Sequence, residues 1–117
     1  MPASLDLITF DTPTPRGAAA FWCAALRLNV SLDEDDGRWL VLSDAAGVRR
    51  IGLQQGSVRP GSVHLDLECS LREFDDEVHR LEALGALLVS PARTEPYGRI
   101  VNLTHPDGTP FDLCAYR

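Results

Sequence analysis

Hydrophobic and polar residues alternate strictly along the segment from Val63 to Cys69. Valine, leucine, leucine and cysteine fall on one side, and His64, Asp66 and Glu68 fall on the other, which is the period of a β-strand with two unlike faces. Three ionisable side chains would be costly in a dry core, so this face is expected to open onto water or a lined cleft. The pattern therefore predicts a strand with one packed face and one face suited to chemistry.

The pattern before this segment predicts a strand, a helix and three more strands. Loose alternation indicates a first strand over residues 5–11. Apolar residues then recur at helical spacing, so we expect a helix that starts at Pro15, is capped by Thr14 and ends near Leu28. Three strands separated by acidic and glycine-containing turns are expected over residues 29–32, 38–43 and 48–55.

The same order of elements starts again after a linker over residues 55–62, which contains two glycines and a proline. Ser70 and Glu73 have the spacing of a capping box, and an apolar stripe from Leu71 to Leu84 predicts a second helix that stops at Gly85. The strands expected after it cover residues 86–89, 99–104 and 111–116. The hairpin turn before the last strand is expected over residues 105–110.

This repetition predicts an α+β fold of two βαβββ modules, about residues 1–56 and 57–117, within a single domain. Each helix can cover only one face of its own sheet. The second face of each sheet must therefore meet another module, a partner or a ligand.

The composition narrows the function classes. A net charge of −6 and a pI near 4.9 argue against nucleic-acid binding and would favour a cationic small molecule only weakly. No apolar run reaches the ~20 residues that span a bilayer, and no secretion signal is recognisable, so a cytoplasmic protein without membrane contact is expected. The spacing of Cys23, Cys69 and Cys114 favours reduced thiols. The sequence contains no nucleophile elbow, P-loop or dinucleotide-binding fingerprint.

Several motifs follow one another in an informative order. They are Asp11-Thr12-Pro13, Ala20-Phe21-Trp22, His64-Leu65-Asp66-Leu67, the segment LEALGA at 81–86 and the segment PDGTPFDL at 106–113. In this order the chain resembles the vicinal oxygen chelate superfamily (glyoxalase, bleomycin-resistance proteins and extradiol dioxygenases), and especially its glyoxalase-like domains. The resemblance covers essentially the whole chain. It implies a curved, open, mixed eight-stranded sheet with the helices outside, a site on the concave side, and a homodimer.

The resemblance also implies a metal position, often built from four side chains. His64 and Asp112 fall at two of the ligand positions, and they are expected to converge on one cleft. The third position falls at Leu7, which cannot ligate, and the fourth at Gly52 or Gln54, of which Gln54 could offer a weak neutral oxygen. Zinc sites in proteins use at least three protein ligands. We therefore expect no tightly bound cofactor, at most a weak divalent metal, and no true metal-dependent glyoxalase activity.

The residues themselves leave alternatives open. His64 shares a strand face with Asp66 and Glu68, which favours a functional role, yet an exposed, hydrogen-bonded histidine without a function is an equal alternative. Asp112 stands between two apolar residues and is expected to have a partner, which could be a metal, His64 or an arginine. Cys114 shares the strand face of Asp112 and is expected to be a buried small hydrophobe. His79 and His105 are expected at the surface.

Two function classes remain. The first is an enzyme of the vicinal oxygen chelate type that acts on a small oxygenated substrate, with His64 as general base or ligand and Asp112 as its partner. The second is a non-catalytic protein of the bleomycin-resistance type that sequesters a drug or metabolite. The incomplete ligand set favours the second class, or chemistry without a metal. In either class, the side chains expected to contact the small molecule are Asp66, Glu68, Trp39, Cys114 and Tyr116.

Overall fold

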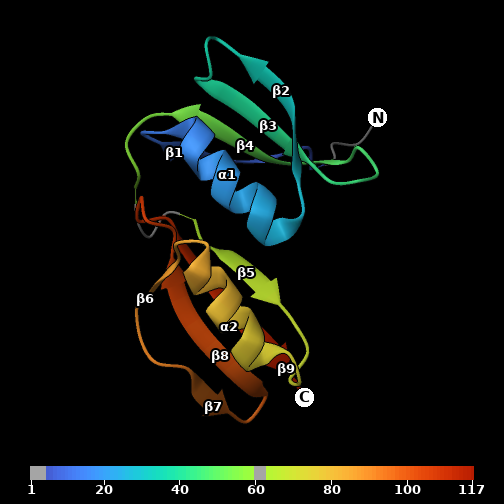
Figure 1. Ribbon diagram of the computed structural model, residues 1–117, viewed down its shortest axis with the longest axis vertical. Helices are drawn as coiled ribbons and strands as arrows, with labels where there is room; N and C mark the ends of the chain where they lie inside the picture. The colour runs from blue at the N-terminus through green and yellow to red at the C-terminus, as the bar shows by residue number, and fades with distance from the viewer. Residues whose placement is uncertain (1–4, 60–62) are drawn as a thin grey trace. The chain divides into compact units, whose positions relative to one another are not determined.

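The computed structural model describes residues 5–59 and 63–117 and shows two compact units, whose boundary lies between Val58 and Arg59 (Figure 1). Each unit is a small sheet with one helix packed on it, and the predicted α+β class is confirmed. Residues 1–4 of the predicted first module and residues 60–62 of the predicted linker lie outside the described residues. No helix in the described part of the chain is long and apolar enough to cross a membrane.

The first unit follows the predicted order of strand, helix and three strands. Its sheet has the order β1-β4-β3-β2, in which β1 runs parallel to β4 and the other pairs are antiparallel. The elements are β1 (Ile8–Thr12), α1 (Pro15–Leu26), β2 (Asn29–Glu34), β3 (Trp39–Ser43) and β4 (Arg49–Gln55).

Helix α1 begins at Pro15, as predicted, because proline lacks the N–H that the first turn leaves unbonded. Thr14 occupies the N-cap position, but its side chain makes no capping hydrogen bond. Phe21 and Trp22 pack edge to face on the buried side of the helix, with ring centroids 4.9 Å apart, and Trp22 stacks on Phe10 of β1. These aromatic rings fix the helix against one face of the sheet.

The second unit repeats this topology, with sheet order β5-β9-β8-β6 and a parallel β5–β9 pair. It contains one strand more than predicted, because the three residues of β7 also pair with β8. A segment that short and polar shows no alternation from which it could be predicted. The elements are β5 (Leu65–Glu68), α2 (Phe74–Ala83), β6 (Leu87–Leu88), β7 (Arg93–Glu95), β8 (Gly98–Thr104) and β9 (Pro110–Tyr116).

Helix α2 starts later than its sequence pattern suggested. The hydroxyl of Ser70 donates to the Glu73 carboxylate (2.9 Å) and accepts from the Glu73 N–H (3.2 Å), but residues 71–73 form a turn before the helix. Leu71 and Leu84 therefore lie just outside the helix and are exposed, although the predicted apolar stripe included them. The stripe that packs on the sheet consists of Phe74, Val78 and Leu81.

Alternation along β9 separates two faces of the second sheet. Phe111, Leu113 and Ala115 are buried on the side of α2, and Asp112 and Cys114 point the other way. The inter-strand register extends this division to the neighbouring strands. We call the side opposite α2 the helix-free face of the second unit; it carries His64, Asp66, Glu68, Arg93, Glu95, Gly98, Ile100, Asn102, Asp112, Cys114 and Tyr116.

The turn between β8 and β9 corrects the prediction that His105 lies at the surface. Its side chain is only 7% exposed, and its Nδ1 accepts a hydrogen bond from the backbone N–H of Asp107 (3.0 Å). The carboxylate of Asp107 in turn accepts from the N–H of Thr109 (2.9 Å). These bonds turn the imidazole inward, which a proline-containing turn sequence alone does not reveal.

Candidate functional site

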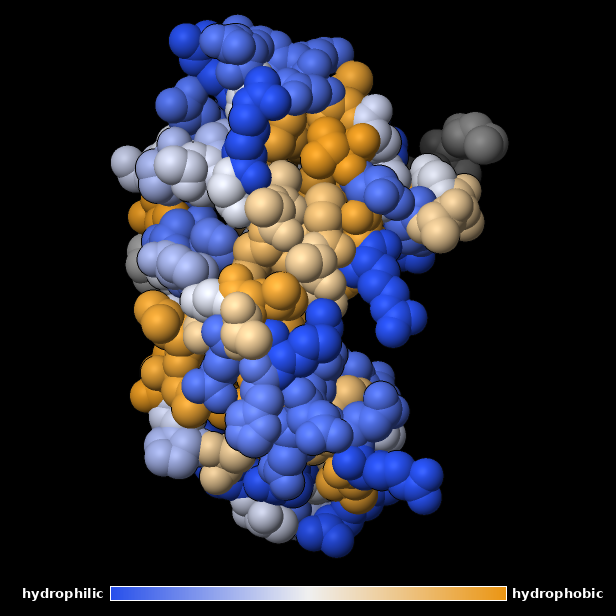
Figure 2. Space-filling model, in the orientation of Figure 1, coloured by the Kyte–Doolittle hydropathy of each residue, from blue (hydrophilic) through white to orange (hydrophobic). Residues whose placement is uncertain are grey.

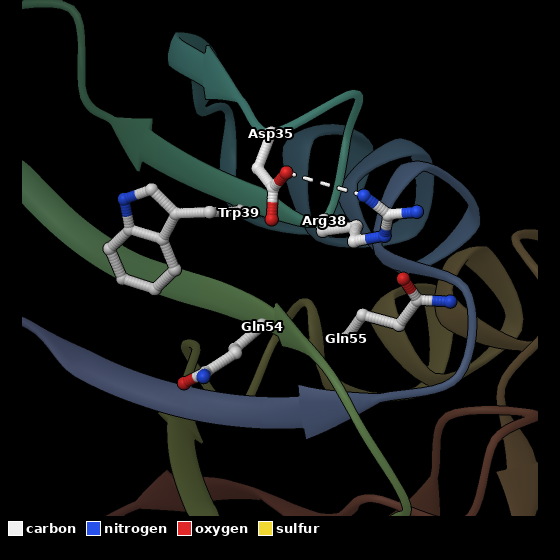
Figure 3. A pocket seen from close by; sticks show the side chains of 5 residues that line it. All are labelled: Asp35, Arg38, Trp39, Gln54 and Gln55. Atoms are coloured by element: carbon white, nitrogen blue, oxygen red, sulfur yellow. Dashed lines mark hydrogen bonds and ion pairs between the residues drawn. The ribbon is translucent and has the colours of Figure 1, made fainter.

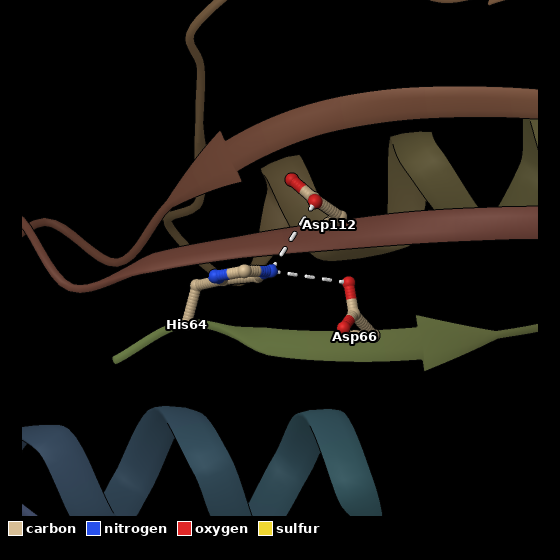
Figure 4. A group of neighbouring side chains, drawn as sticks. All are labelled: His64, Asp66 and Asp112. Carbon is tan, nitrogen blue, oxygen red and sulfur yellow. Dashed lines mark ion pairs between the residues drawn. The ribbon is translucent and has the colours of Figure 1, made fainter. Parts of the chain in front are cut away.

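Three ionisable side chains meet on the helix-free face of the second unit (Figure 4). The parallel pairing of β5 with β9 sets Asp66 beside Asp112, and His64 precedes Asp66 by two residues. Nε2 of His64 lies 3.5 Å from Oδ1 of Asp66 and 3.9 Å from Oδ2 of Asp112. The structure thus brings His64 and Asp112 together, and it adds Asp66 to them.

The spacing and chemistry of these three groups fit a divalent cation. One ligand atom from each residue lies within 4.8 Å of the others, whereas ligand atoms about 2.1 Å from a tetrahedral ion are about 3.4 Å apart. Small side-chain rotations would therefore close the site. The side chains of His64 and Asp66 are 56% and 66% exposed, against 21% for Asp112. Two of these three side chains would have to be ordered from water, which would weaken the binding of a cation here.

Asp112 is held by an asparagine that the sequence analysis did not single out. Nδ2 of Asn102 donates to Oδ1 of Asp112 across the β8–β9 pair, at 2.6 Å. Oδ1 of Asn102 accepts from Nη1 of Arg93 (2.8 Å) and from the hydroxyl of Ser90 (3.2 Å). An asparagine between apolar residues of one strand was the signal in the sequence, but its position opposite Asp112 depends on the strand register.

Three of the other residues predicted to contact a small molecule, Glu68, Cys114 and Tyr116, continue along the same face. Glu68 pairs in register with Cys114, which is buried as a small side chain. Tyr116 is half-exposed, and its ring lies 6.1 Å from that of Tyr97. The pKa of Tyr116 is raised, first by its hydrogen bond with Cys114, then by the electrostatic effect of Cys114, and then by burial and by the carboxylates of Asp66 and Glu68.

The two cysteine thiols with a shifted pKa, Cys23 and Cys69, are not activated as nucleophiles. Burial raises the pKa of Cys23, and burial with nearby negative charge raises that of Cys69, so both remain protonated at neutral pH. All three cysteines are free, in agreement with the expected reduced thiols.

The first unit has a hollow of its own, in which Trp39 and Gln54 meet (Figure 3). Its volume is ≈ 590 Å³, and Trp39 of β3 lies beside Gln54 of β4 in the sheet register. Asp35 and Arg38 form an ion pair of 3.2 Å at its edge. The indole ring lies where a side chain at Gly52 would be, since a Cβ there would come within 2.6 Å of the ring. An aromatic wall beside neutral amides can contact a small organic molecule.

The predicted ligand positions are thus divided between the units. Leu7 precedes β1, and Gln54 lies on β4 of the first unit. In the second unit the third ligand atom beside His64 and Asp112 belongs to Asp66, which the sequence analysis had treated as a substrate contact. The assignment of Gln54 as a weak ligand stays a prediction.

Comparison with known proteins places this geometry in a family. The family model described as a glyoxalase-like domain matches residues 7–114. The chain belongs to this family. The family lies within the vicinal oxygen chelate superfamily, so the resemblance inferred from the motifs is confirmed. Among curated proteins, none matches the chain.

Solved structures support the same fold for this glyoxalase-like chain. A variant of the fosfomycin resistance protein FosX from Listeria monocytogenes, complexed with Mn(II) and 1S,2S-dihydroxypropylphosphonic acid, has a TM-score of 0.80 at 21% identity, covering 100% of this chain and 93% of its own. A protein from Agrobacterium tumefaciens has a TM-score of 0.81 at 17% identity, covering 99% of both chains. A glyoxalase-related enzyme from Fulvimarina pelagi has a TM-score of 0.76 at 19% identity, covering 96% of this chain and 87% of its own.

Proposed function

We propose that this protein binds a small oxygenated ligand on the helix-free face of its second unit, together with a weakly held divalent cation. The observation that carries the proposal is the convergence of His64, Asp66 and Asp112, whose ligand atoms lie within 4.8 Å of one another. One imidazole and two carboxylates suit Mn²⁺, Fe²⁺ or Zn²⁺. A cation bound there would polarise an oxygen of the ligand as a Lewis acid.

The three side chains have distinct tasks in this proposal. Asp112 is the fixed member, because Asn102 holds one of its oxygens. His64 is exposed and can reach a bound molecule, so it can ligate or accept a proton from the ligand. Asp66 contributes negative charge at the rim, where an exposed carboxylate attracts a cation without restricting access.

The charge of this face limits the ligand class. It carries the carboxylates of Asp66, Glu68, Glu95 and Asp112 against the guanidinium of Arg93. FosX from Listeria monocytogenes was solved with a phosphonate, which is anionic. The four carboxylates still exceed the charge of Arg93 and a bound divalent cation together (−4 against +3), so we propose that the ligand of this protein is neutral or cationic. We expect fosfomycin to bind weakly or not at all.

His64→Ala tests the cation site. Calorimetric titration with Mn²⁺ and Zn²⁺ should show weak binding to the unaltered protein, and the affinity should fall at least about tenfold in the variant because one of three ligands is lost. The thermal midpoint should stay unchanged, since the side chain is more than half exposed. His79→Ala is the matched control, because His79 lies exposed on α2. Unchanged binding in His64→Ala would contradict the proposed cation site. If one metal ion per chain remained bound after dialysis, the proposal that the cation is weakly held would be wrong.

The hollow at Trp39 supports a second candidate, a sequestering binder without catalysis. Its ≈ 590 Å³ falls within the size range of ligand sites, which is about 300–1,000 Å³. A screen of small organic cations in the absence of metal, read by calorimetric titration, tests this candidate. Binding lost in Trp39→Ala and kept in His64→Ala would favour the sequestering function over the cation-assisted one.

We further propose that the protein acts as a homodimer in the cytoplasm. Leu87 and Leu88 of the edge strand β6, followed by Val89, are exposed, and Figure 2 shows hydrophobic surface where β6 lies. An apolar edge strand is a site of association that proteins usually cover. Light scattering at tens of micromolar should give twice the chain mass of 12.8 kDa, and Leu87→Lys should shift it toward the monomer. A monomer in the unaltered protein would contradict the proposal.

A further inference from the structure

The helix-free face of the second unit carries a polar chain that extends beyond the three candidate ligands. It runs from Glu95 to Arg93, Asn102 and Asp112 through contacts of 3.2, 2.8 and 2.6 Å. We infer that Asn102, fixed by Arg93 and Ser90, is a positioning residue that presets Asp112 for its ligand. The inference rests on the proposed function in one respect, namely that Asp112 contacts the bound cation or ligand.

The orientation of the Asn102 amide follows from its neighbours. An amide oxygen and nitrogen are hard to tell apart by shape, so the assignment depends on hydrogen-bond partners. Arg93 has only donors, which requires the oxygen of Asn102 to face it. The Nδ2 group is then the one that faces Asp112, and an ionised carboxylate can only accept. Each polar atom of the Asn102 side chain therefore has a complementary partner. In the reversed amide, the NH₂ group would face the donors of Arg93 and the oxygen would face the Asp112 carboxylate.

This arrangement fixes one oxygen of Asp112 and leaves the other available. The 2.6 Å bond from Asn102 is short for N–H···O and holds Oδ1. Oδ2 is the atom that lies 3.9 Å from His64. A carboxylate held by one oxygen loses its freedom to rotate, so the ordering cost is met on folding and not on binding. Asp66, by contrast, is two-thirds exposed.

Strand β7 explains how Arg93 reaches this position. Arg93 pairs in register with Ile100 of β8, two residues before Asn102 on the same face. Its Nε is held from the other side by the Glu95 carboxylate, and Ser90 supplies a second donor to the Asn102 oxygen. The positive charge of Arg93 polarises the amide, which strengthens the bond that Asn102 donates to Asp112. Strand β7 thus supports Asp112 indirectly, because Arg93 holds Asn102 and Asn102 holds Asp112.

A purely electrostatic role for Arg93 would predict the opposite outcome on mutation. Arg93 is a cation on the face that would bind a cation, so its removal should tighten cation binding if only charge mattered. If Arg93 acts through Asn102, its removal should weaken binding, because Asp112 is no longer preset. Loss of such supporting contacts typically lowers metal affinity about 10–100-fold. The sign of the change therefore separates the two roles.

The experiment compares Arg93→Ala, Asn102→Ala and Asn29→Ala with the unaltered protein by calorimetric titration with Mn²⁺. Asn29→Ala is the matched control, since Asn29 is an exposed asparagine at the start of β2. We expect about a tenfold loss of affinity in the first two variants and none in the control. Arg93→Lys should recover part of the loss, because it restores a donor. Tighter or unchanged binding in Arg93→Ala would overturn the inference.

A second readout needs no metal and separates this inference from the proposed function. Three-bond NMR couplings between Hα and Hβ report whether the Asp112 side chain keeps one rotamer. We expect a single rotamer in the unaltered protein and averaged couplings in Asn102→Ala. Thermal melting curves should show that both proteins are folded. If Mn²⁺ fails to bind while Asp112 behaves in this way, the proposed cation site is wrong and the positioning role stands. Averaged couplings in the unaltered protein would overturn the positioning role itself.

Discussion

The two units share one topology but differ in the chemistry of their helix-free faces. In both, the first strand runs parallel to the last, and the last strand pairs antiparallel with the one before it. The register matches Thr9 with Gly52 and Val41 in the first unit, and Asp66 with Asp112 and Asn102 in the second. The positions can therefore be compared residue by residue.

At these equivalent positions only the second unit carries ionisable side chains. The second unit has His64, Asp66, Asp112 and Asn102 at these positions, and the first three are ionisable. The first unit has Leu7, Thr9, Gly52 and Val41 in their places. Because the three strands that carry these positions are paired in the same way in both units, the difference at these positions lies in their side chains. The scaffold therefore does not determine the site; the residues on one face of it do.

The glycine in the first unit is part of this difference. A Cβ at Gly52 would lie 2.6 Å from both the Trp39 ring and the Thr9 hydroxyl. The missing side chain therefore lets the indole cover the position at which the second unit has a carboxylate. One unit offers an aromatic wall where the other offers ligands.

The largest expected effect comes from filling that space. Gly52→Ala should lower the free energy of unfolding by about 1–3 kcal/mol, because the added methyl group overpacks against Trp39 and Thr9. Denaturant unfolding measures it, and the tryptophan emission should change as the Trp39 ring moves.

Gly17→Ala provides the control of opposite sign. A Cβ at Gly17 in α1 would meet Thr14 at an ordinary 3.4 Å, so alanine should stabilise the helix by about 0.5–1 kcal/mol. If Gly52→Ala proved as harmless as Gly17→Ala, the account of the covered face in the first unit would be wrong.

The equivalent hairpin turns extend the comparison to smaller effects. The β8–β9 turn has a buried Asp107, and the β3–β4 turn has the more exposed Asp44. Burial raises the pKa of Asp107, but hydrogen bonds from the backbone and the side chain of Thr109, together with the electrostatic effect of the nearby His105, outweigh it, so the pKa lies below its usual value. For Asp44 the hydrogen bond from Val48 is the main cause of a lowered pKa, followed by burial, which opposes it, and by Arg50.

Asp107→Asn should destabilise the protein by about 1 kcal/mol at pH 7, because charge-assisted hydrogen bonds become neutral ones. A folded-state pKa below the unfolded value means that the ionised carboxylate stabilises the fold above the unfolded pKa of about 3.9, and that this contribution is lost as the pH falls through the folded pKa. The difference between the two proteins, measured by urea unfolding, should therefore be constant from about pH 5 to 7 and shrink below about pH 4. A difference that grew toward low pH would refute this assignment.

Asp44→Asn should show the same direction with the smallest effect of the series. Its carboxylate accepts from the N–H groups of Ala46 and Val48, and an asparagine oxygen can keep these bonds. The ion pair with Arg50 is lost, but solvent and salt weaken such a pair. Urea unfolding of both variants under the same conditions checks this ranking of the losses in unfolding free energy. A larger loss in Asp44→Asn than in Asp107→Asn would contradict it.

The sequence by itself determined the elements whose signals are local. Alternation and helical spacing are properties of neighbouring residues, so the repeated order of strand, helix and three strands could be predicted, as could the shared face of His64 and Asp66. The isolated charge of Asp112 in an apolar strand predicted that its side chain has a partner, because burying a carboxylate without one is costly. The family resemblance followed from the order of these motifs.

Only the tertiary structure decided which residues meet. The pairing of Asp66 with Asp112 and of Asn102 with Asp112 depends on the register between strands that are distant in sequence. Strand β7, and with it the position of Arg93, depends on pairing with β8, since three polar residues have no periodicity of their own. The burial of His105 likewise results from hydrogen bonds made when the turn closes. Long-range pairing is set by the packing of the whole sheet, and no local pattern encodes it.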